Sequence, residues 1–409
     1  MRSLGVNSWP GCTRWIGAAL LPPAFLITPS LAVQGGADYS VALRETYDED
    51  IFRTGQGGAE DYLTTLSLSA GWTGQTPRSS TRFQYLPEYR AYARFDTLDH
   101  LDQRFDSAWQ FSPGRRSRVG LRQGFARARQ QAGFVDFEGG TAQPITPLNW
   151  RNSWDFEPSY TLALSRRWDL STRASYRIQR FQSEDLVDST QTGLEVSTTS
   201  LVGRGQRIGG LLRGDAYSFD EQAVSSEQAD RFLRAEAIWT RDVGRILSWR
   251  AGSGFFRASG PGVGAAVKPT LSLNMSWGFP LTRVLVGYDL GYSSSGGLGG
   301  VSRSQTAGLG LSRRWGRALQ TSVRTTYLSR ESLGEEFGAL ENINGHSADL
   351  DVSYTWVTGL GAAFHYTLVR QERSTATELD YQVVAVSMTY TPTRHRKQTG
   401  SAPAPGEAR

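Results

Sequence analysis

Apolar and polar residues alternate with a period of two along most of this chain, and no other feature limits its fold as strongly. In the segments 282–293 and 346–357 the even-numbered positions are mainly apolar or aromatic, whereas the odd-numbered positions are mainly Gly, Ser, Thr or Asp. Successive side chains of a β-strand point to opposite faces, whereas a helix would scatter these charges around its surface. The pattern therefore predicts an all-β protein whose strands are apolar on one face and polar on the other.

The alternating segments follow one another from residue 39 to residue 391 without a linker that would separate domains. Short turns, such as 113–115, alternate with longer loops, such as 130–149. Outer-membrane barrels have this arrangement, with the short turns in the periplasm. We count about eighteen strands, or about sixteen as the alternative, because the segments 190–202 and 302–313 alternate poorly. Residues 33–391 are thus predicted to form a transmembrane, antiparallel, up-and-down β-barrel.

Residues 1–32 have the features of a signal peptide. Arg2 and Arg14 precede a mainly apolar stretch over 16–27, and small residues around Ala32 fit the cleavage rule. The apolar stretch is too short to span a bilayer as a stable helix. The protein is therefore expected to be exported, and strands must provide any membrane insertion.

The segment after the last strand differs from the barrel in composition. Residues 392–409 are rich in Pro, Ala and Gly and are predicted to form a disordered periplasmic tail. The single cysteine, Cys12, lies in the predicted signal peptide, which excludes disulfides and zinc–thiolate sites from the mature chain. We expect the protein in the outer membrane of a Gram-negative cell, with both termini in the periplasm.

Charged residues separate along the chain. Long loops are acidic, as at Asp48-Glu49-Asp50 and Glu335-Glu336, whereas arginines lie in strands and short turns. An arginine that faces lipid at mid-membrane costs about 2–4 kcal/mol, so strand arginines must face the interior, which is aqueous in a wide barrel. We expect these residues to line the channel and the solute path: Arg82, Arg90, Tyr92, Arg94, Arg118, Arg122, Arg173, Arg177, Arg213, Tyr217, Arg234, Arg250 and Arg324. An alternative is that arginine–carboxylate pairs only fill and stiffen the wall.

The sequence has no recognisable set of catalytic residues. His100 lies among loop carboxylates and His346 lies beside Ser347, which is weak support for a hydrolase at the barrel rim. The acidic loops match no calcium-loop pattern, and the glycine-rich segment 291–300 lacks the lysine of a phosphate-binding loop. We therefore expect no enzyme activity, no cofactor, no metal site and no nucleic-acid partner.

The first hairpins resemble one bacterial family. The stretches ETYDEDIF (45–52) and EDYLTTLS (60–67) resemble the opening of the outer-membrane family called β-barrel porin 2, with Asp50 where that family usually has Asn and Ala70-Gly71 in place of Pro-Gly. The likeness is best over residues 40–130. The resemblance implies a barrel of about eighteen strands that serves exopolysaccharide export together with a periplasmic export protein.

Three functions follow as alternatives. The resemblance and the arginine placement together favour a passive conduit for the export of a polysaccharide, with a periplasmic export partner. The first alternative is a general diffusion porin for small anionic solutes. The second is a non-conducting structural or adhesive barrel whose acidic loops bind a surface partner. In every case the outer wall would contact outer-membrane lipid and lipopolysaccharide.

Overall fold

A computed structural model of the protein describes residues 34–52, 59–130, 149–182, 187–220, 230–244, 246–259, 266–294, 301–332, 342–356, 359–373 and 379–392. These residues form 18 β-strands and a single turn of 3-10 helix, η2 (Asp96–Leu98). No helix among them is long and apolar enough to cross a membrane. The strands are β1 (Gln34–Asp48), β2 (Asp61–Gln75), β3 (Ser79–Tyr92), β4 (His100–Phe111), β5 (Ser117–Gln130), β6 (Asn149–Ala163), β7 (Trp168–Phe181), β8 (Asp188–Gly203), β9 (Gln206–Asp220), β10 (Asp230–Val243), β11 (Leu247–Ser259), β12 (Ala266–Gly278), β13 (Thr282–Ser294), β14 (Val301–Trp315), β15 (Leu319–Ser332), β16 (Ile343–Thr355), β17 (Leu360–Arg373) and β18 (Leu379–Tyr390).

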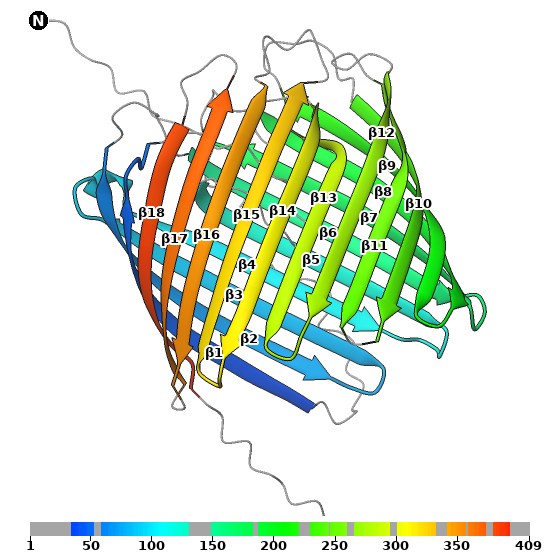
Figure 1. Ribbon diagram of the computed structural model, residues 1–409, viewed down its shortest axis with the longest axis horizontal. Helices are drawn as coiled ribbons and strands as arrows, with labels where there is room; N and C mark the ends of the chain where they lie inside the picture. Colours follow the sequence, from blue (N-terminus) through cyan, green and yellow to red (C-terminus); the bar gives the residue numbers. More distant parts are fainter. Residues whose placement is uncertain are drawn as a thin grey trace, which may run out of the picture.

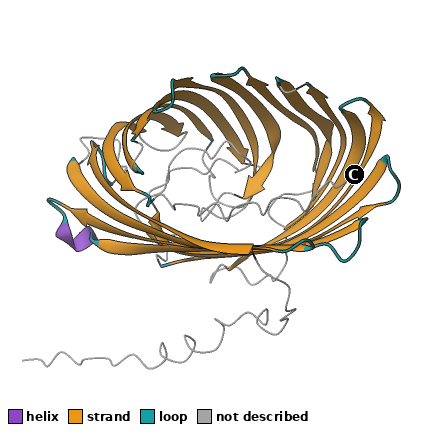
Figure 2. Cartoon of the chain, turned by 90° about the horizontal axis from the view of Figure 1, so that it is seen from below, coloured by secondary structure: helices purple, strands orange, loops and turns teal. Residues whose placement is uncertain are grey.

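The strands form one closed barrel. Each strand pairs antiparallel with its neighbours in sequence, and β1 also pairs with β18, which closes the sheet. Figure 1 shows the strands tilted against the barrel axis, and Figure 2 shows them arranged around a common interior. Gln34 pairs with Gln75 and Tyr390 pairs with Leu360, so β1 begins and β18 ends at the rim that carries the short turns.

This architecture confirms the predicted all-β, up-and-down barrel with 18 strands, and the alternative of sixteen is wrong. The two poorly alternating segments are complete strands, β8 and β14, because hydrogen bonds to both neighbours hold them whatever their side chains. The predicted signal peptide (1–32) and, except for Pro392, the predicted tail (392–409) lie outside the described residues.

The outer face of the barrel is apolar. Residues paired across antiparallel strands point to the same face, and the pairs Val41–Leu68 and Leu43–Leu66 of β1 and β2 are exposed on the outside. Large apolar side chains are exposed in the same way on all the remaining strands except β5 and β13, among them Leu194, Leu212, Phe255, Leu309 and Val386. A bilayer covers such an apolar band, since closed barrels leave no unpaired backbone in lipid. The protein is therefore a multi-pass β-barrel of the Gram-negative outer membrane.

Most buried side chains of the interior lie near the rim that carries the long loops. Three buried clusters form there: Tyr217, Phe232, Phe256 and Ala258 on β9–β11; Val369, Leu379 and Tyr381 on β17 and β18; and Ile51, Leu63, Tyr92 and Leu98 near β1–β3. Toward the short-turn rim the interior wall is polar and more exposed. The long-loop side of the interior is thus packed, and the short-turn side is open to water.

Two adjacent leucines of β9 test which face of the wall meets lipid and which meets water. Leu211 pairs with Glu236 on the interior, whereas Leu212 pairs with Ala235 on the outside and is 50% exposed. Replacing Leu212 by arginine is expected to lower the free energy of unfolding by about 2–4 kcal/mol, because the guanidinium would lie in lipid. Leu211→Arg should cost less than about 1 kcal/mol, since that side chain meets water and Glu236. Urea unfolding in phospholipid vesicles measures the free energy of unfolding of both variants. Equal losses would contradict the assignment of Leu212 to the lipid face and Leu211 to the interior.

Candidate solute path on the interior wall

The strand register places twelve of the thirteen predicted path residues on the interior face. These are Arg82, Arg90 and Tyr92 on β3, Arg118 and Arg122 on β5, Arg173 and Arg177 on β7, Arg213 and Tyr217 on β9, Arg234 on β10, Arg250 on β11 and Arg324 on β15. Their surroundings differ widely. Some are exposed, some are ion-paired, and the two tyrosines are buried.

Arg94 is the exception, because β3 ends at Tyr92, two residues before it. The Asp61 carboxylate accepts the backbone N–H of Arg94 at 3.0 Å and of Phe95 at 3.3 Å, which turns the chain out of the ladder. The Arg94 guanidinium instead pairs with Glu60 at 2.9 Å, with 57% of its side chain exposed. Arg94 thus belongs to the long-loop rim and not to the wall.

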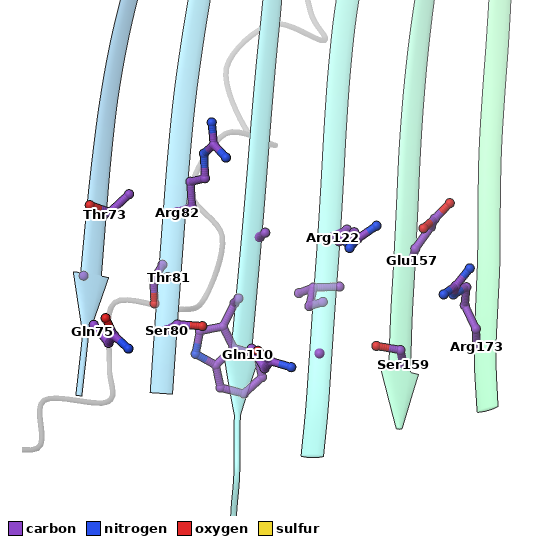
Figure 3. Close-up of a pocket in the computed structure, with 15 residues that line it drawn as sticks. Thr73, Gln75, Ser80, Thr81, Arg82, Gln110, Arg122, Glu157, Ser159 and Arg173 are labelled. Atoms are coloured by element: carbon purple, nitrogen blue, oxygen red, sulfur yellow. The ribbon is translucent and has the colours of Figure 1, made fainter. Parts of the chain in front are cut away.

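Three of the predicted arginines gather at one pocket of about 390 Å³ on the interior of β2–β7. Arg82, Arg122 and Arg173 come from alternate strands, and Figure 3 shows Glu157 of β6 between Arg122 and Arg173. All three arginines are exposed. Arg82 donates to Gln84 at 3.0 Å, whereas Arg122 and Arg173 have no hydrogen-bond or ion-pair partner in the described part of the chain. Their guanidinium groups therefore remain available to a solute.

Arginine is also the more frequent charge of the interior wall near the short turns. In the described strands, the interior arginines within five residues of a short-turn end are Arg82, Arg118, Arg122, Arg173, Arg207, Arg250, Arg283, Arg314 and Arg324. The interior carboxylates in the same zone are Asp38, Asp106, Asp169, Asp242 and Asp351. The entrance on the short-turn side therefore carries an excess of positive charge.

Deeper in the barrel several arginines are neutralised by carboxylates. Arg90 contacts Glu88 at 2.6 Å and Asp102 at 3.3 Å, and Arg177 pairs with Asp155. Arg234 pairs with its strand neighbour Glu236 at 2.5 Å. The alternative of a stiffened wall thus describes the middle of the barrel, while the short-turn side keeps unpaired arginines.

On the interior face, the Asp215 carboxylate of β9 accepts hydrogen bonds from side chains of three strands, β8, β9 and β13. It is 4% exposed and accepts hydrogen bonds from Arg213 Nε at 2.7 Å, Gln191 Nε2 at 3.1 Å and Tyr292 Oη at 2.9 Å. Tyr292 belongs to β13, whose ladder with β12 stops at Leu290. The end of β13 therefore leaves the wall and lies over the interior of its more distant neighbours.

The aromatic contacts of Tyr292 confirm this course. Its ring lies 4.7 Å from that of Phe232 on β10 and 4.9 Å from that of Phe256 on β11. Thr270, an interior residue of β12, is only 1% exposed. The end of β13 thus adds an inner layer over β9–β12 and narrows the barrel on the long-loop side. Sequence reasoning missed this layer, because β13 alternates regularly to its end.

Tyr92 and Tyr217 were expected to line the solute path. Both face the interior, but they are 5% and 6% exposed and belong to the buried clusters near the long loops. Tyr217 packs edge-on against Phe232 with ring centroids 5.5 Å apart. Neither ring is open to a solute, and both serve packing.

The acidic residues near the long loops act largely as caps of strand ends. Asp99 Oδ1 accepts the N–H of Tyr92 at 2.8 Å, and Asp188 Oδ1 accepts the N–H of Phe181 at 2.7 Å. Asp48 and Asp61 are almost fully buried. The acidic loop residues Glu184, Asp185, Glu221, Glu335 and Glu336 lie outside the described residues. The buried or capping acids therefore hold backbone groups, whereas Glu49, Glu60 and Asp96 are exposed.

The two histidines considered for a hydrolase lie on opposite faces of the wall. His100 is buried between Tyr92 and Trp150, and its Nδ1 lies 2.6 Å from Leu98 O. His346 is on the outer face, with its ring 5.0 Å from that of Tyr327.

A polar chain that the sequence reasoning missed lines the interior of β16 and β17. His365 Nδ1 contacts Asp351 Oδ1 at 2.6 Å, and its Nε2 contacts Thr367 Oγ1 at 2.7 Å. Thr367 in turn donates to Asp349 at 2.7 Å. The period-two spacing of His365 and Thr367 on one strand is the signal that could have found it.

No family model matches the chain, and no curated protein matches it either. Solved structures of outer-membrane proteins do match. OccK2 (OpdF) of Pseudomonas aeruginosa, also solved with glucuronate, covers 87% of this chain over 98% of its own, with 12% identity and a TM-score of 0.46. OccAB3 of Acinetobacter baumannii has 11% identity, and a BenF-like porin of Pseudomonas fluorescens Pf-5 has 12% identity; both have the same coverage and TM-scores of 0.45. At this distance the likeness does not assign a solute, which has to come from the wall itself.

Proposed function

We propose that this barrel is a passive porin for small anionic solutes. The observation that carries the proposal is the set of exposed, unpaired arginines at the interior pocket, above all Arg122 and Arg173. A guanidinium group keeps its charge in any aqueous channel and binds carboxylates bidentately. Unpaired arginines at an entrance raise the local concentration of anions.

The arrangement of charges supports passage more than tight binding. Arginines recur on alternate strands from β3 to β7, so several exposed sites for an anion lie next to one another around the wall near the short turns. Exposed charges interact only weakly with a solute at ordinary salt. Weak and repeated sites allow an ion to enter and to leave, which conduction requires.

The alternatives have less support. The polysaccharide conduit and its periplasmic partner depended on the resemblance to β-barrel porin 2, for which no family model matches. Tyr92 and Tyr217, the two aromatic residues of the predicted path that could stack on sugar rings, are buried. The adhesive barrel depended on free acidic loops, but Asp48 and Asp61 are buried. If a strain that lacks this protein lost its surface polysaccharide, the polysaccharide-conduit alternative would regain support.

Planar-bilayer conductance in a KCl gradient tests the proposal. The purified barrel should conduct and favour anions. Each exposed charge contributes a few tenths of a kcal/mol, so Arg82→Gln, Arg122→Gln and Arg173→Gln together should lower the anion-to-cation permeability ratio by about three- to fivefold. Glucuronate, the ligand in one OccK2 structure, and glucose serve as charged and neutral probes in liposome swelling.

The control removes charge of the same sign from the outer wall. Arg127 and Arg180 pair with Gln103 and Asn152, respectively, on the outer face of β5 and β7. Arg127→Gln with Arg180→Gln should leave the permeability ratio within about 1.5-fold of the wild type, because these charges do not line the interior. A triple interior variant with unchanged selectivity, or a barrel that carries no current, would refute the porin.

A further inference from the structure

We infer that the outer wall of β10 and β11 carries a binding site for a phosphorylated lipid of the outer leaflet. Arg231 of β10 and Arg257 of β11 point outward, because their ladder partners Ser259 and Leu233 lie on the face opposite to the interior residues Phe232 and Phe256. Both arginines are exposed. They lie near the long-loop ends of their strands, on the side of the cell exterior.

The two guanidinium groups can reach one phosphate. Leu233 is the direct partner of Arg257, and Arg231 lies two residues before Leu233 on the same face. Such diagonal neighbours in an antiparallel sheet lie about 7–8 Å apart, and their β-carbons are somewhat closer. Two arginine side chains at that spacing can converge on a single phosphate through charge-assisted hydrogen bonds.

Apolar side chains lie directly around and below this arginine pair. Leu233 is 50% exposed, Phe255 is 64% exposed and Val267 is 65% exposed. Val267 is the β12 partner of Arg257, and Phe255 lies two residues nearer the membrane centre. A ligand that fits needs a phosphate at the level of the arginines and acyl chains below it. A lipid A headgroup has both features.

Other outward arginines at this height already have partners. Arg180 pairs with Asp188 at 3.1 Å and Arg370 with Glu372 at 3.8 Å, and the Arg127 guanidinium lies 5.0 Å from the centre of the Trp150 ring. In the described part of the chain, Arg231 and Arg257 have no carboxylate, hydrogen-bond or ring partner. Their charge facing lipid headgroups therefore distinguishes this stretch of the wall.

Native mass spectrometry of the purified full-length barrel with added lipid A tests the site. Arg231→Gln with Arg257→Gln should weaken lipid A binding by at least about tenfold, which is the loss of about 1.4 kcal/mol. Arg180→Gln with Arg370→Gln removes the same charge from outward positions that are ion-paired, and should change binding by less than about twofold. Heat-modifiable gel mobility establishes that each variant is folded, and Arg231→Lys with Arg257→Lys should restore part of the affinity.

Two further arms identify the ligand chemistry. Dephosphorylated lipid A should bind the wild type about as weakly as lipid A binds the double glutamine variant. Inorganic phosphate at millimolar concentration should not displace lipid A, because it lacks the acyl chains. The inference is overturned by equal binding of the phosphorylated and dephosphorylated lipids, by an unaffected double glutamine variant, or by displacement with free phosphate.

Discussion

Replacing Asp215 by alanine is expected to lower the free energy of unfolding by about 3 kcal/mol and to raise the single-channel conductance. The carboxylate is 4% exposed and accepts two hydrogen bonds from Arg213, at 2.7 and 3.0 Å, as well as those of Gln191 and Tyr292. Breaking a buried ion pair costs about 3–5 kcal/mol. We expect the lower end, because 36% of the Arg213 side chain keeps access to water.

The conductance should rise because Asp215 holds the end of β13 across the interior. Without the carboxylate, Tyr292 loses its hydrogen bond and the inner layer over β9–β12 is released. Tyr292→Phe removes only this hydrogen bond and should cost about 1 kcal/mol, with a smaller rise in conductance. Asp169→Ala, which breaks only a 3.7 Å exposed pair with Arg207, should leave stability within about 0.5 kcal/mol. Unchanged conductance in the Asp215 variant would show that the β13 end does not limit the pore.

The barrel could be predicted from the sequence because its pattern is local. The two faces of a strand follow from the parity of residue numbers, so alternation identified 16 clear strands and the lipid face without knowledge of any contact. The same parity placed Arg213 with Asp215 and Arg234 with Glu236 on one face, and both are ion pairs. The full count of 18 also includes β8 and β14, which alternate poorly and are held by backbone hydrogen bonds to both neighbouring strands.

The ends of strands could not be predicted, because distant residues decide them. The alternation along β3 continues in the sequence to residue 95, but the strand stops at Tyr92, since Asp61 of β2 accepts the N–H groups of Arg94 and Phe95. Nothing within residues 80–95 signals this cap. The placement of Arg94 was therefore wrong, whereas that of Arg90, four residues earlier, agrees with the register.

Contacts between side chains of different strands could not be predicted from the sequence either. Arg122 and Arg177 look alike in sequence, but Arg177 meets Asp155 of β6 while Arg122 has no partner in the described residues. The difference depends on register, which the local pattern does not contain. The burial of Tyr217 likewise follows from Tyr292, which is 75 positions later in the chain and folds over it.

A substitution at Gly254 on β11 is also expected to lower the free energy of unfolding strongly, because the backbone of the neighbouring strand leaves no room for a side chain. A β-carbon at Gly254 would lie 1.9 Å from Ala235 O and 2.7 Å from Glu236 Cα. Both atoms belong to the neighbouring strand β10, so they cannot move away without breaking the ladder of 231–243 with 247–259. Gly254→Ala is therefore expected to lower the free energy of unfolding by more than about 3 kcal/mol, a cost that single substitutions reach only through strain or a lost core contact.

Gly310 on β14 is the matched control for this substitution. It also faces the interior within a strand, but an added β-carbon would meet Leu285 Cβ at 3.5 Å, an ordinary contact. Gly310→Ala should therefore be neutral or stabilise the barrel by up to about 1 kcal/mol, because alanine restricts the unfolded chain. Tryptophan fluorescence during urea unfolding in phospholipid vesicles measures both variants. If both substitutions changed the free energy of unfolding by the same sign and size, the close approach of β10 to Gly254 would not constrain the sheet. Opposite signs would show that the pairing of β10 with β11 requires a residue without a side chain at position 254.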